Sequence, residues 1–153
     1  MIDEIIFRRA EISDISQFSE LRQSQLIEEG EGDAANITEQ IKEYLYEYIP
    51  NDTFAAYIAL HNKKIIATGG ITFYRLPPWF CNPTGLTGQI GSIYTIPEYR
   101  RMGIANKILD NIINEAKERE CKLIRVTASE DGKLLYQNYG FKIKNNFMQY
   151  IIE

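Results

Sequence analysis

The hydrophobic pattern of this chain changes its period several times, and this alternation restricts the folds that it can adopt. Three segments, 15–26, 38–48 and 104–116, place apolar residues at the spacing of an amphipathic helix. The runs around them are rich in β-branched and aromatic residues, which is typical of strands. The sequence therefore predicts a mixed α/β layer structure in the order β-α-α-β-β-β-α-β-α-β-β. The expected strands are residues 4–10, 53–60, 64–74, 89–96, 122–128, 141–144 and 147–152.

Local signals place the ends of several elements. Ser13 and Thr38 are suited to cap the first two helices, because their hydroxyls can accept hydrogen bonds from unpaired helix amides. Residues 61–63 join two strands as a hairpin turn. A short helix over 130–139 is expected to end at Gly140, which is well placed as a left-handed residue.

Composition sets limits on location and partners. The chain has 153 residues, of which 44% are hydrophobic, and no repeat or linker, so we expect one domain over residues 1–153. Its net charge of −4 argues against general nucleic-acid binding. We find neither a signal peptide nor the ~20 apolar residues of a membrane span, and we expect a cytoplasmic protein. Cys81 and Cys121 are expected to be reduced thiols, and one histidine leaves little for a metal site.

The segment EYRRMGIANKIL, residues 98–109, changes from charged to helical at its middle. Arg100-x-x-Gly103-x-Ala105 stands at the helix start, where unpaired amides and the helix dipole attract anions. The glycine permits close approach of a ligand to the backbone, and arginines are suited to phosphate. These residues fit a phosphate or pyrophosphate site. Solvated arginines before an ordinary helix are an equally good interpretation of the same residues.

A second segment, LLYQNYGF at residues 134–141, places Tyr136 on a short helix directly after a strand. A tyrosine in such a position is most often a partly buried packing residue. A functional role for Tyr136 therefore needs an independent reason.

Three segments resemble the GNAT superfamily of acyl-CoA-dependent N-acyltransferases. Residues 93–105, IYTIPEYRRMGIA, are similar to its motif Arg/Gln-x-x-Gly-x-Gly/Ala, and LLYQNYGF resembles its later motif, in which a tyrosine precedes Gly-Phe. FRRAEISDI, residues 7–15, is similar to its first strand and helix. The resemblance covers essentially the whole chain. It implies a GNAT-like fold, with a central, mostly antiparallel sheet, a splayed parallel strand pair and helices on both faces.

The resemblance implies that acetyl-CoA is the acyl donor. The pyrophosphate would lie on the amides of the helix start, and the pantetheine arm would pair with the preceding strand. The implied binding residues are Tyr94, Thr95, Ile96, Arg100, Arg101, Met102, Gly103, Ile104, Ala105, Asn106 and, more weakly, Ser129, which stands where many members have asparagine. The family commonly has a bulge in the strand that ends at Thr95, and a bulge can direct an amide at the thioester oxygen.

The resemblance also implies direct attack by a neutral amine on the thioester. A phenol has a pKa near ~10 and a thiol one near ~8.5, so a tyrosine is protonated at neutral pH and can donate to a departing thiolate. Tyr136 occupies the matching position and is the expected general acid. Tyr139 is expected to pack, and no metal is expected.

The base that deprotonates the amine is left open. Glu28, Glu29, Glu31 and Asp33 could approach the acceptor cleft, and a solvated acidic edge is the alternative. His61 lies in a turn and is expected to be exposed.

Residues 75–88 form an irregular stretch that contains Trp79 and Phe80. These aromatic residues either pack inward or form a wall of the acceptor pocket. Together with the acidic residues after the first helix they suggest a cationic amine with an apolar part.

Two functions follow. The first is an N-acetyltransferase that moves an acetyl group from acetyl-CoA to a primary amine, on a small molecule or a peptide, within a ternary complex. The alternative is a non-catalytic acyl-CoA-binding or sensing module with the same fold. The expected partner is an amine-bearing acceptor, without nucleic acid or membrane, and a homodimer is a candidate assembly.

Overall fold

A five-stranded sheet forms the centre of the structure, a computed structural model that describes residues 4–30 and 35–153. The strands lie in the order β1-β2-β3-β4-β5. The first four pair as antiparallel neighbours, whereas β4 and β5 are parallel. The bounds are β1 Ile6–Arg9, β2 Phe54–His61, β3 Lys64–Arg75, β4 Leu86–Thr95 and β5 Leu123–Val126. The mostly antiparallel sheet with one parallel pair is therefore confirmed.

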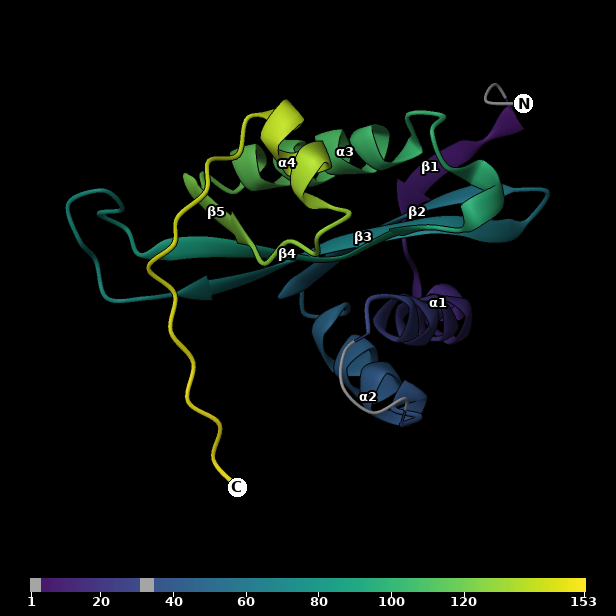
Figure 1. The fold of residues 1–153 in the computed structure, drawn as a ribbon, viewed down its shortest axis with the longest axis horizontal. Coiled ribbons are helices and arrows are strands. Elements are labelled where there is room, and N and C mark those ends of the chain that lie inside the picture. The colour runs from purple at the N-terminus through teal and green to yellow at the C-terminus, as the bar shows by residue number, and fades with distance from the viewer. Residues whose placement is uncertain (1–3, 31–34) are drawn as a thin grey trace.

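Helices cover both faces of this sheet. In Figure 1, α1 and α2 lie on one face, and α3 and α4 lie on the other. Their bounds are α1 Ile15–Glu28, α2 Thr38–Tyr48, α3 Ile104–Glu118 and α4 Lys133–Tyr139, with short 3-10 helices η2 Ile12–Asp14 and η3 Pro97–Tyr99. The mixed α/β class with helices on both faces is confirmed. Within the described residues, no helix is long and apolar enough to span a membrane.

β3 is the middle strand, and its residues 65–71 are all buried. Two adjacent glycines let the layers approach its backbone closely. A Cβ atom on Gly69 would lie 2.5 Å from the Ile108 side chain on α3, and one on Gly70 would lie 2.1 Å from the Phe54 ring. Both faces of β3 therefore belong to the core, and its apolar run has no polar alternation because neither face meets water.

Two helix starts differ in detail from the prediction. Ser13 does not cap α1, because residues 12–14 form η2, whose capping box joins Glu11 and Asp14. The Asp14 carboxylate accepts hydrogen bonds from the Glu11 amide at 2.7 Å and from the Arg8 guanidinium at 2.7 Å. Thr38 is the first residue of α2, and its amide donates to the side-chain oxygen of Asn36. The Asp14 carboxylate and the Asn36 side-chain oxygen therefore accept backbone hydrogen bonds at these two starts, where the sequence predicts the hydroxyls of Ser13 and Thr38.

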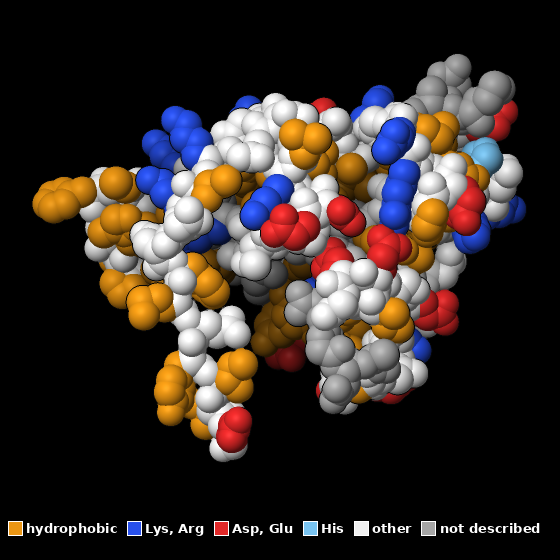
Figure 2. Space-filling view, in the orientation of Figure 1, with side chains coloured by type: hydrophobic (Ala, Val, Ile, Leu, Met, Phe, Trp, Pro, Cys, Tyr) orange, Lys and Arg blue, Asp and Glu red, His pale blue; other side chains and the backbone are white. Residues whose placement is uncertain are grey.

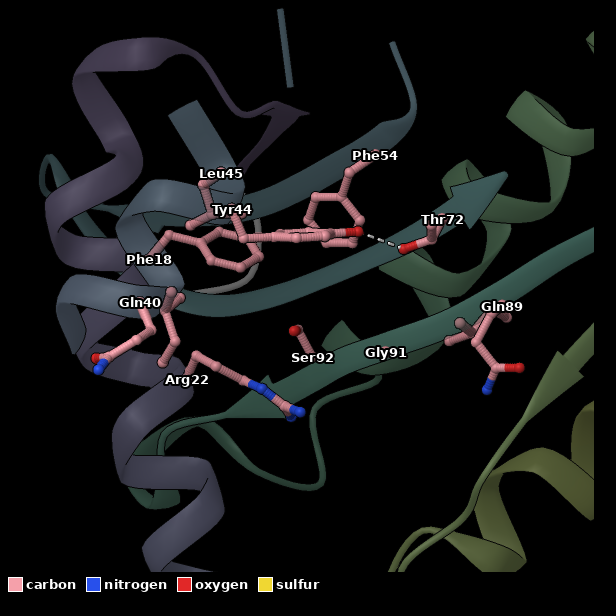
Figure 3. A pocket seen from close by; sticks show the side chains of 12 residues that line it. Phe18, Arg22, Gln40, Tyr44, Leu45, Phe54, Thr72, Gln89, Gly91 and Ser92 are labelled. Carbon is pink, nitrogen blue, oxygen red and sulfur yellow. Dashed lines mark hydrogen bonds between the residues drawn. The ribbon is translucent and has the colours of Figure 1, made fainter. Parts of the chain in front are cut away.

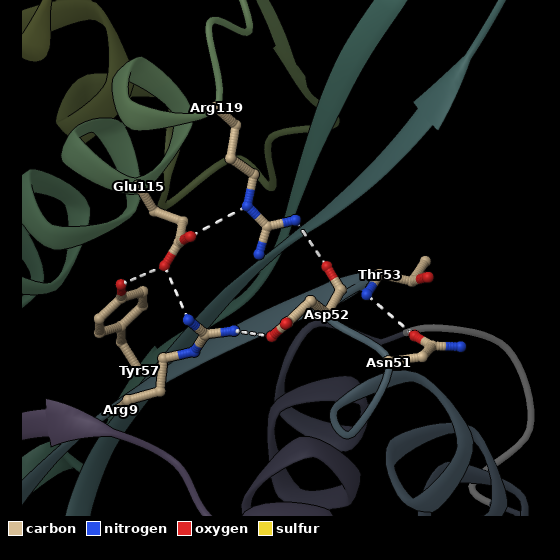
Figure 4. A network of polar contacts seen from close by, with 7 residues as sticks. All are labelled: Arg9, Asn51, Asp52, Thr53, Tyr57, Glu115 and Arg119. Atoms are coloured by element: carbon tan, nitrogen blue, oxygen red, sulfur yellow. Dashed lines mark hydrogen bonds and ion pairs between the residues drawn. The ribbon is translucent and has the colours of Figure 1, made fainter.

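A network of polar and charged side chains joins α3 to the edge strand β1 and its neighbour β2 (Figure 4). Glu115 accepts hydrogen bonds from Arg9 at 2.9 Å, from the Tyr57 hydroxyl at 2.7 Å and from Arg119 at 2.9 Å. Arg9 also binds the Asp52 carboxylate, and Arg119 donates to the Asp52 carbonyl. Glu115 therefore fastens α3 to β1, β2 and the turn before β2.

The prediction of two C-terminal strands is wrong. Residues 141–144 and 147–152 form no strand, and the chain after α4 runs past the ends of β5 and β4 and then away from the sheet. A strand needs a ladder of hydrogen bonds to a neighbour. The strand-like composition of this segment is present, but no neighbouring strand among the described residues pairs with it.

Candidate active site

The turn before α3 presents backbone amides to solvent. Arg101 and Gly103 have left-handed backbones, with φ of 64° and 78°, and α3 begins directly after them at Ile104. No heavy atom lies within 4 Å of the position that a Cβ atom on Gly103 would occupy. The amides of the first helical turn have no carbonyl partner within the helix. Open space beside these amides fits a phosphate group. Of the other predicted residues, Met102 and Asn106 are exposed and Ala105 is half-buried.

Arg100 is engaged with the protein itself. Its Nε donates to the Thr95 carbonyl at 2.8 Å, and Nη2 donates to the Glu28 carboxylate at 2.7 Å. Its guanidinium also lies 5.5 Å from the centre of the Tyr94 ring. Arg100 thus connects the end of α1 to the end of β4. Glu28 lies beside this arginine, and Tyr94 donates a hydrogen bond to the same carboxylate.

The parallel strands β4 and β5 part beside this turn. Their pairing ends at Ile90 and Val126, while β4 continues to Thr95. Beyond Ile90 the β5 side of β4 has no strand partner among the described residues, which leaves an edge for an extended ligand. Two groups of the predicted segment are already bonded within the protein: the Ile96 amide donates to the Ile66 carbonyl, and the Thr95 carbonyl accepts from Arg100.

The bulge expected from the resemblance is present in β4. Gly70 pairs with Gly91 and Thr68 with Tyr94, so two residues of β4, Ser92 and Ile93, face the single residue between Thr68 and Gly70. Ser92 has a φ of 60°. The Thr68 hydroxyl donates to the Ser92 carbonyl at 2.7 Å and so holds this conformation. An extra residue in a bulge leaves the regular ladder, which frees backbone groups at this point.

Gln25 ties the bulge to the end of α1. Its side chain is buried, and its Nε2 donates to the Ile93 carbonyl at 3.0 Å and to the Glu29 carboxylate at 3.1 Å. Its oxygen accepts from Arg22 at 3.0 Å. The sequence analysis missed Gln25. A signal was available, since Gln25 lies seven residues after Phe18 on the buried face of α1, where a polar residue is unusual.

Tyr136 is buried at the middle of α4. Its ring packs edge-on against Phe141 with ring centres 5.5 Å apart, and 7% of the residue is exposed. Burial, assisted by the negative charge of Glu29, raises the pKa of Tyr136 to about 12. No group in residues 4–30 and 35–153 forms a hydrogen bond with its hydroxyl, whose oxygen is not itself fully enclosed. A buried phenol that keeps its proton and has no fixed acceptor is suited to donate to a ligand atom.

Glu29 acts on Tyr136 from the other side of the sheet. Glu29 follows α1, and Tyr136 belongs to α4 on the opposite face. The pairing of β4 and β5 ends at Ile90 and Val126, so no continued ladder of these strands screens one face from the other beyond that point. Tyr139, in contrast, donates to Asp110 on α3 at 2.7 Å and connects the two helices.

A cavity of about 340 Å³ reaches the same bulge from the α1 and α2 face (Figure 3). Its apolar wall contains the rings of Phe18, Tyr44 and Phe54. The Tyr44 hydroxyl forms a hydrogen bond with the Thr72 hydroxyl at 2.8 Å, so the upper wall is fixed. The remaining lining residues are Arg22, Gln40, Ile41, Leu45, Gln89, Ile90, Gly91 and Ser92. Among the residues that the structure describes, the lining is thus aromatic, with amide groups and the arginine Arg22.

Trp79 and Phe80 lie outside this cavity. Both belong to the loop between β3 and β4, where the Trp79 ring lies 5.8 Å from the Arg125 guanidinium and Phe80 is fully exposed. An acceptor role for the loop stays a prediction, and the aromatic wall that the structure does provide comes from α1, α2 and β2.

Four further residues from the sequence analysis have other outcomes. Ser129 accepts a hydrogen bond from the Gly132 amide at 3.1 Å and so shapes the turn before α4. The expectation that His61 is exposed is wrong, because its ring is half-buried against Tyr99 and forms a hydrogen bond to the Tyr99 hydroxyl. Glu31 and Asp33 lie outside the described residues.

The mostly antiparallel sheet, whose parallel strands part beside a helix N-terminus, is the fold that the resemblance to acyl-CoA-dependent N-acyltransferases implies. The comparisons agree with this class: the chain belongs to the acetyltransferase (GNAT) family, whose model matches residues 17–141. The resemblance noted in the sequence is therefore confirmed.

The relatives include proteins of known structure. A predicted acetyltransferase from Clostridium acetobutylicum, whose crystal structure contains acetyl-CoA, is 36% identical, with a TM-score of 0.92 over 96% of each chain. The chain is 27% identical to N-alpha-acetyltransferase 30 of Saccharomyces cerevisiae, in an alignment that covers 98% of this chain and 84% of that protein. A GCN5-related N-acetyltransferase from Ralstonia eutropha, 21% identical, shares the fold with a TM-score of 0.88 over 96% of this chain and 98% of that one.

Proposed function

We propose that this protein transfers an acetyl group from acetyl-CoA to a primary amine by direct attack within a ternary complex. The observation that supports this most is that the open edge of β4, beyond its pairing with β5, begins beside the bulge that the cavity reaches from the other face. A ligand on this edge and a ligand in the cavity could therefore meet near the bulge, and Tyr136 and Glu29 are the protonated phenol and the carboxylate that we assign to this meeting point. Acyl transfer from a thioester needs a proton acceptor and a proton donor at such a meeting point.

The chain's own groups fit acetyl-CoA on the donor side. The amides from Arg101 to Asn106 and the open space at Gly103 suit the pyrophosphate. The unpaired edge of β4 suits the amide-containing pantetheine arm, which can bond to it as an added strand would. Arg100 contributes by fixing the turn, since its guanidinium already binds Glu28 and Thr95. We propose Arg101, which is exposed, as the residue that contacts phosphate directly.

The reaction then needs one proton transfer at each end. The amine nitrogen forms a bond to the thioester carbonyl carbon, and Glu29 takes the proton that the nitrogen loses, directly or through water. The carbon–sulfur bond breaks, and Tyr136 donates its proton to the departing sulfur. The products are an N-acetylated amine and CoA. Gln25 positions Glu29 and, through the Ile93 carbonyl, the bulge beside the reacting carbonyl.

The cavity favours an acceptor amine that carries an apolar or aromatic group. Phe18, Tyr44 and Phe54 supply flat apolar surface, and Gln40 and Gln89 supply amide groups for a polar portion. A peptide N-terminus with an apolar side chain satisfies this description, and the similarity to N-alpha-acetyltransferase 30 supports testing it.

The test is CoA release from acetyl-CoA, measured with a panel of aromatic and aliphatic primary amines and peptides of varied first residue. We expect turnover with at least one apolar acceptor and none with tertiary amines of matched shape. Acetyl-CoA binding by calorimetry without turnover on any acceptor would instead favour the non-catalytic acyl-CoA-binding module.

A further inference from the structure

Arg22 places a positive charge on the wall of the cavity. It lies on α1, it is half-buried, and its guanidinium reaches toward Gly91 and Ser92 of β4 (Figure 3). On the outer face that Figure 2 shows, basic and acidic side chains lie among one another in water, where ion pairs contribute little. A charge beside an apolar wall is screened less, so Arg22 attracts an anionic group of a ligand more strongly.

The wall around Arg22 is apolar, aromatic and small. Phe18 and Phe54 are 1% and 4% exposed, and their ring centres lie 6.3 Å apart in an edge-on contact. The Tyr44 ring packs against Phe54 with centres 5.5 Å apart. Such rings are suited to receive an apolar or aromatic side chain. At about 340 Å³ the cavity lies at the lower end of the ~300–1,000 Å³ of ligand pockets, which suits an acceptor of the size of one amino acid.

Gln25 holds Arg22 and Glu29 at the two ends of one amide group. Its Oε1 accepts a hydrogen bond from Arg22 at 3.0 Å, and its Nε2 donates to the Glu29 carboxylate at 3.1 Å. A cation and an anion are therefore held close together and in a fixed order beside the bulge. A guanidinium has five N–H donors, so Arg22 can bind a carboxylate of a ligand and keep its bond to Gln25.

We propose that the acceptor is a free α-amino acid with an apolar or aromatic side chain, and that Arg22 binds its carboxylate. The amine and the carboxylate of such a molecule are attached to one carbon, which matches the close spacing of Glu29 and Arg22. The amine then faces Glu29 and the bulge, and the side chain lies against Phe18, Tyr44 and Phe54. This inference rests on the proposed function and narrows its acceptor.

Arg22 binds the acceptor and takes no part in the bond changes. The α-amine nitrogen forms a bond to the acetyl carbonyl carbon and gives a proton to Glu29. The carbon–sulfur bond breaks, and the sulfur takes the proton of Tyr136. The products are an N-acetyl amino acid and CoA, and the carboxylate is unchanged. Loss of Arg22 is therefore expected to raise the acceptor KM more than it lowers kcat.

The first test compares acceptors on the wild-type protein by CoA release. L-phenylalaninamide keeps the ring and the amine of L-phenylalanine and replaces only the carboxylate. KM is expressed for the neutral amine, because the two amines differ in pKa. We expect a KM on the order of 10- to 100-fold higher for the amide, since a hydrogen bond between two charged groups is lost. An amide, or a peptide that begins with phenylalanine, used as well as the free amino acid would overturn the proposal.

Variants of Arg22 give the second test. Arg22→Gln should raise the KM for L-phenylalanine on the order of 10- to 100-fold and leave the KM for the amide unchanged. Arg22→Lys should restore part of the difference, because it keeps the charge without the planar fork. Arg125→Gln is the matched control, since Arg125 is exposed on β5 and does not line the cavity. An equal rise in KM for both acceptors in Arg22→Gln would indicate a structural role and refute the assignment.

Binding of the reaction product tests the site without turnover. The CoA-bound protein is titrated with N-acetyl-L-phenylalanine and with N-acetyl-L-phenylalaninamide, and binding is followed by nuclear magnetic resonance shifts. We expect tighter binding of the carboxylate form, and loss of this preference in Arg22→Gln. That preference in a protein that transfers no acetyl group would refute the proposed function and leave the carboxylate site standing. Acetyl transfer to amines without that preference would refute the carboxylate site alone.

Discussion

Burial and the negative charge of Glu29 raise the pKa of Tyr136 to about 12, although Glu29 follows α1 and Tyr136 belongs to α4 on the opposite face of the sheet. Along the chain they are far apart, and neither lies on a strand. The pairing of β4 and β5 ends at Ile90 and Val126, so no continued ladder of these two strands separates the faces beyond that point. The proposed proton acceptor and proton donor thus come from opposite faces of an interrupted sheet.

Replacing Tyr136 by phenylalanine tests the donor. The ring and its contact with Phe141 are kept, and only the hydroxyl is lost. We expect kcat to fall on the order of 10²-fold or somewhat less, because a CoA thiolate is already a fair leaving group. Affinity for acetyl-CoA, measured by calorimetry, should stay close to that of the wild type. Tyr139→Phe is the control: it removes a hydroxyl that binds Asp110, and it should change turnover little. Full activity in Tyr136→Phe with chemistry rate-limiting would make water the proton source.

The pH dependence gives a second test of the same residue. The pKa of Tyr136 is raised to about 12 by burial and by Glu29, so the phenol holds its proton, and stays active as a donor, at every pH below that value. The rate should therefore rise with pH as the acceptor amine loses its proton, and it should not fall between about pH 8 and 10 through loss of the tyrosine proton. A descending limb in this range that disappears in Tyr136→Phe would show that the pKa is not raised.

Glu29→Gln tests the base. The amide keeps the shape and can still bond to Gln25, but it cannot take a proton at neutral pH. We expect kcat to fall about 10²-fold, at the lower end of the usual contribution of a general base. The neighbouring Glu28→Gln is a matched control, because Glu28 binds Arg100 in a pair exposed to solvent, which is worth about 0–1 kcal/mol. It should affect the single-turnover rate at saturating acetyl-CoA much less. Equal losses in both variants would exclude Glu29 as the specific base.

Substitutions at two glycines test the donor site and the acceptor site separately. A side chain at either position would point into open space, at the turn before α3 for Gly103 and into the cavity for Gly91. Gly103→Val should weaken acetyl-CoA binding strongly, since it blocks the pyrophosphate and strains a backbone with a φ of 78°. Gly91→Val should instead raise the acceptor KM more than it affects acetyl-CoA affinity. Unchanged CoA affinity in a folded Gly103→Val protein would refute the phosphate site.

Glu115 links stability to pH. Burial alone would raise its pKa, but hydrogen bonds from Tyr57 and Arg119 and the charges of Arg9 and Arg119 outweigh burial and lower the pKa below 4.5. The ionised form therefore favours folding. This contribution is complete above the unfolded value and is lost as pH falls through the lower folded value.

The measurement is urea unfolding between pH 7 and pH 3. Glu115→Gln should lower the free energy of unfolding at pH 7 by about 1–3 kcal/mol, and the difference from the wild type should shrink toward pH 3. Glu118→Gln, an exposed neighbour on α3, should have little effect at either pH. A difference between Glu115→Gln and the wild type that did not depend on pH would argue against an ionised Glu115.

The sequence determined those features that neighbouring residues decide together. The apolar spacing of residues 104–116 predicts α3 and the face that it buries, and the structure agrees at Ile108 and Ile112. The turn at 61–63 and the positive φ of Gly140 after α4 follow from local backbone preferences in the same way. The family motifs also single out Tyr136, whose role as general acid stays a prediction.

Tertiary structure decided the features that depend on residues distant in the chain. The resemblance implies that Arg100 binds the cofactor, and the structure adds a bond from its guanidinium to Glu28, which lies 72 residues earlier. Gln25 meets the β4 bulge across 68 residues of sequence, and the gap beside this bulge exists only because the pairing of β4 and β5 ends at Ile90 and Val126. Residues 147–152 have the composition of a strand, yet a strand forms only where a neighbouring backbone completes its hydrogen bonds. Composition and period describe what one segment prefers, whereas pairing and the approach of side chains depend on which other segment the fold places beside it.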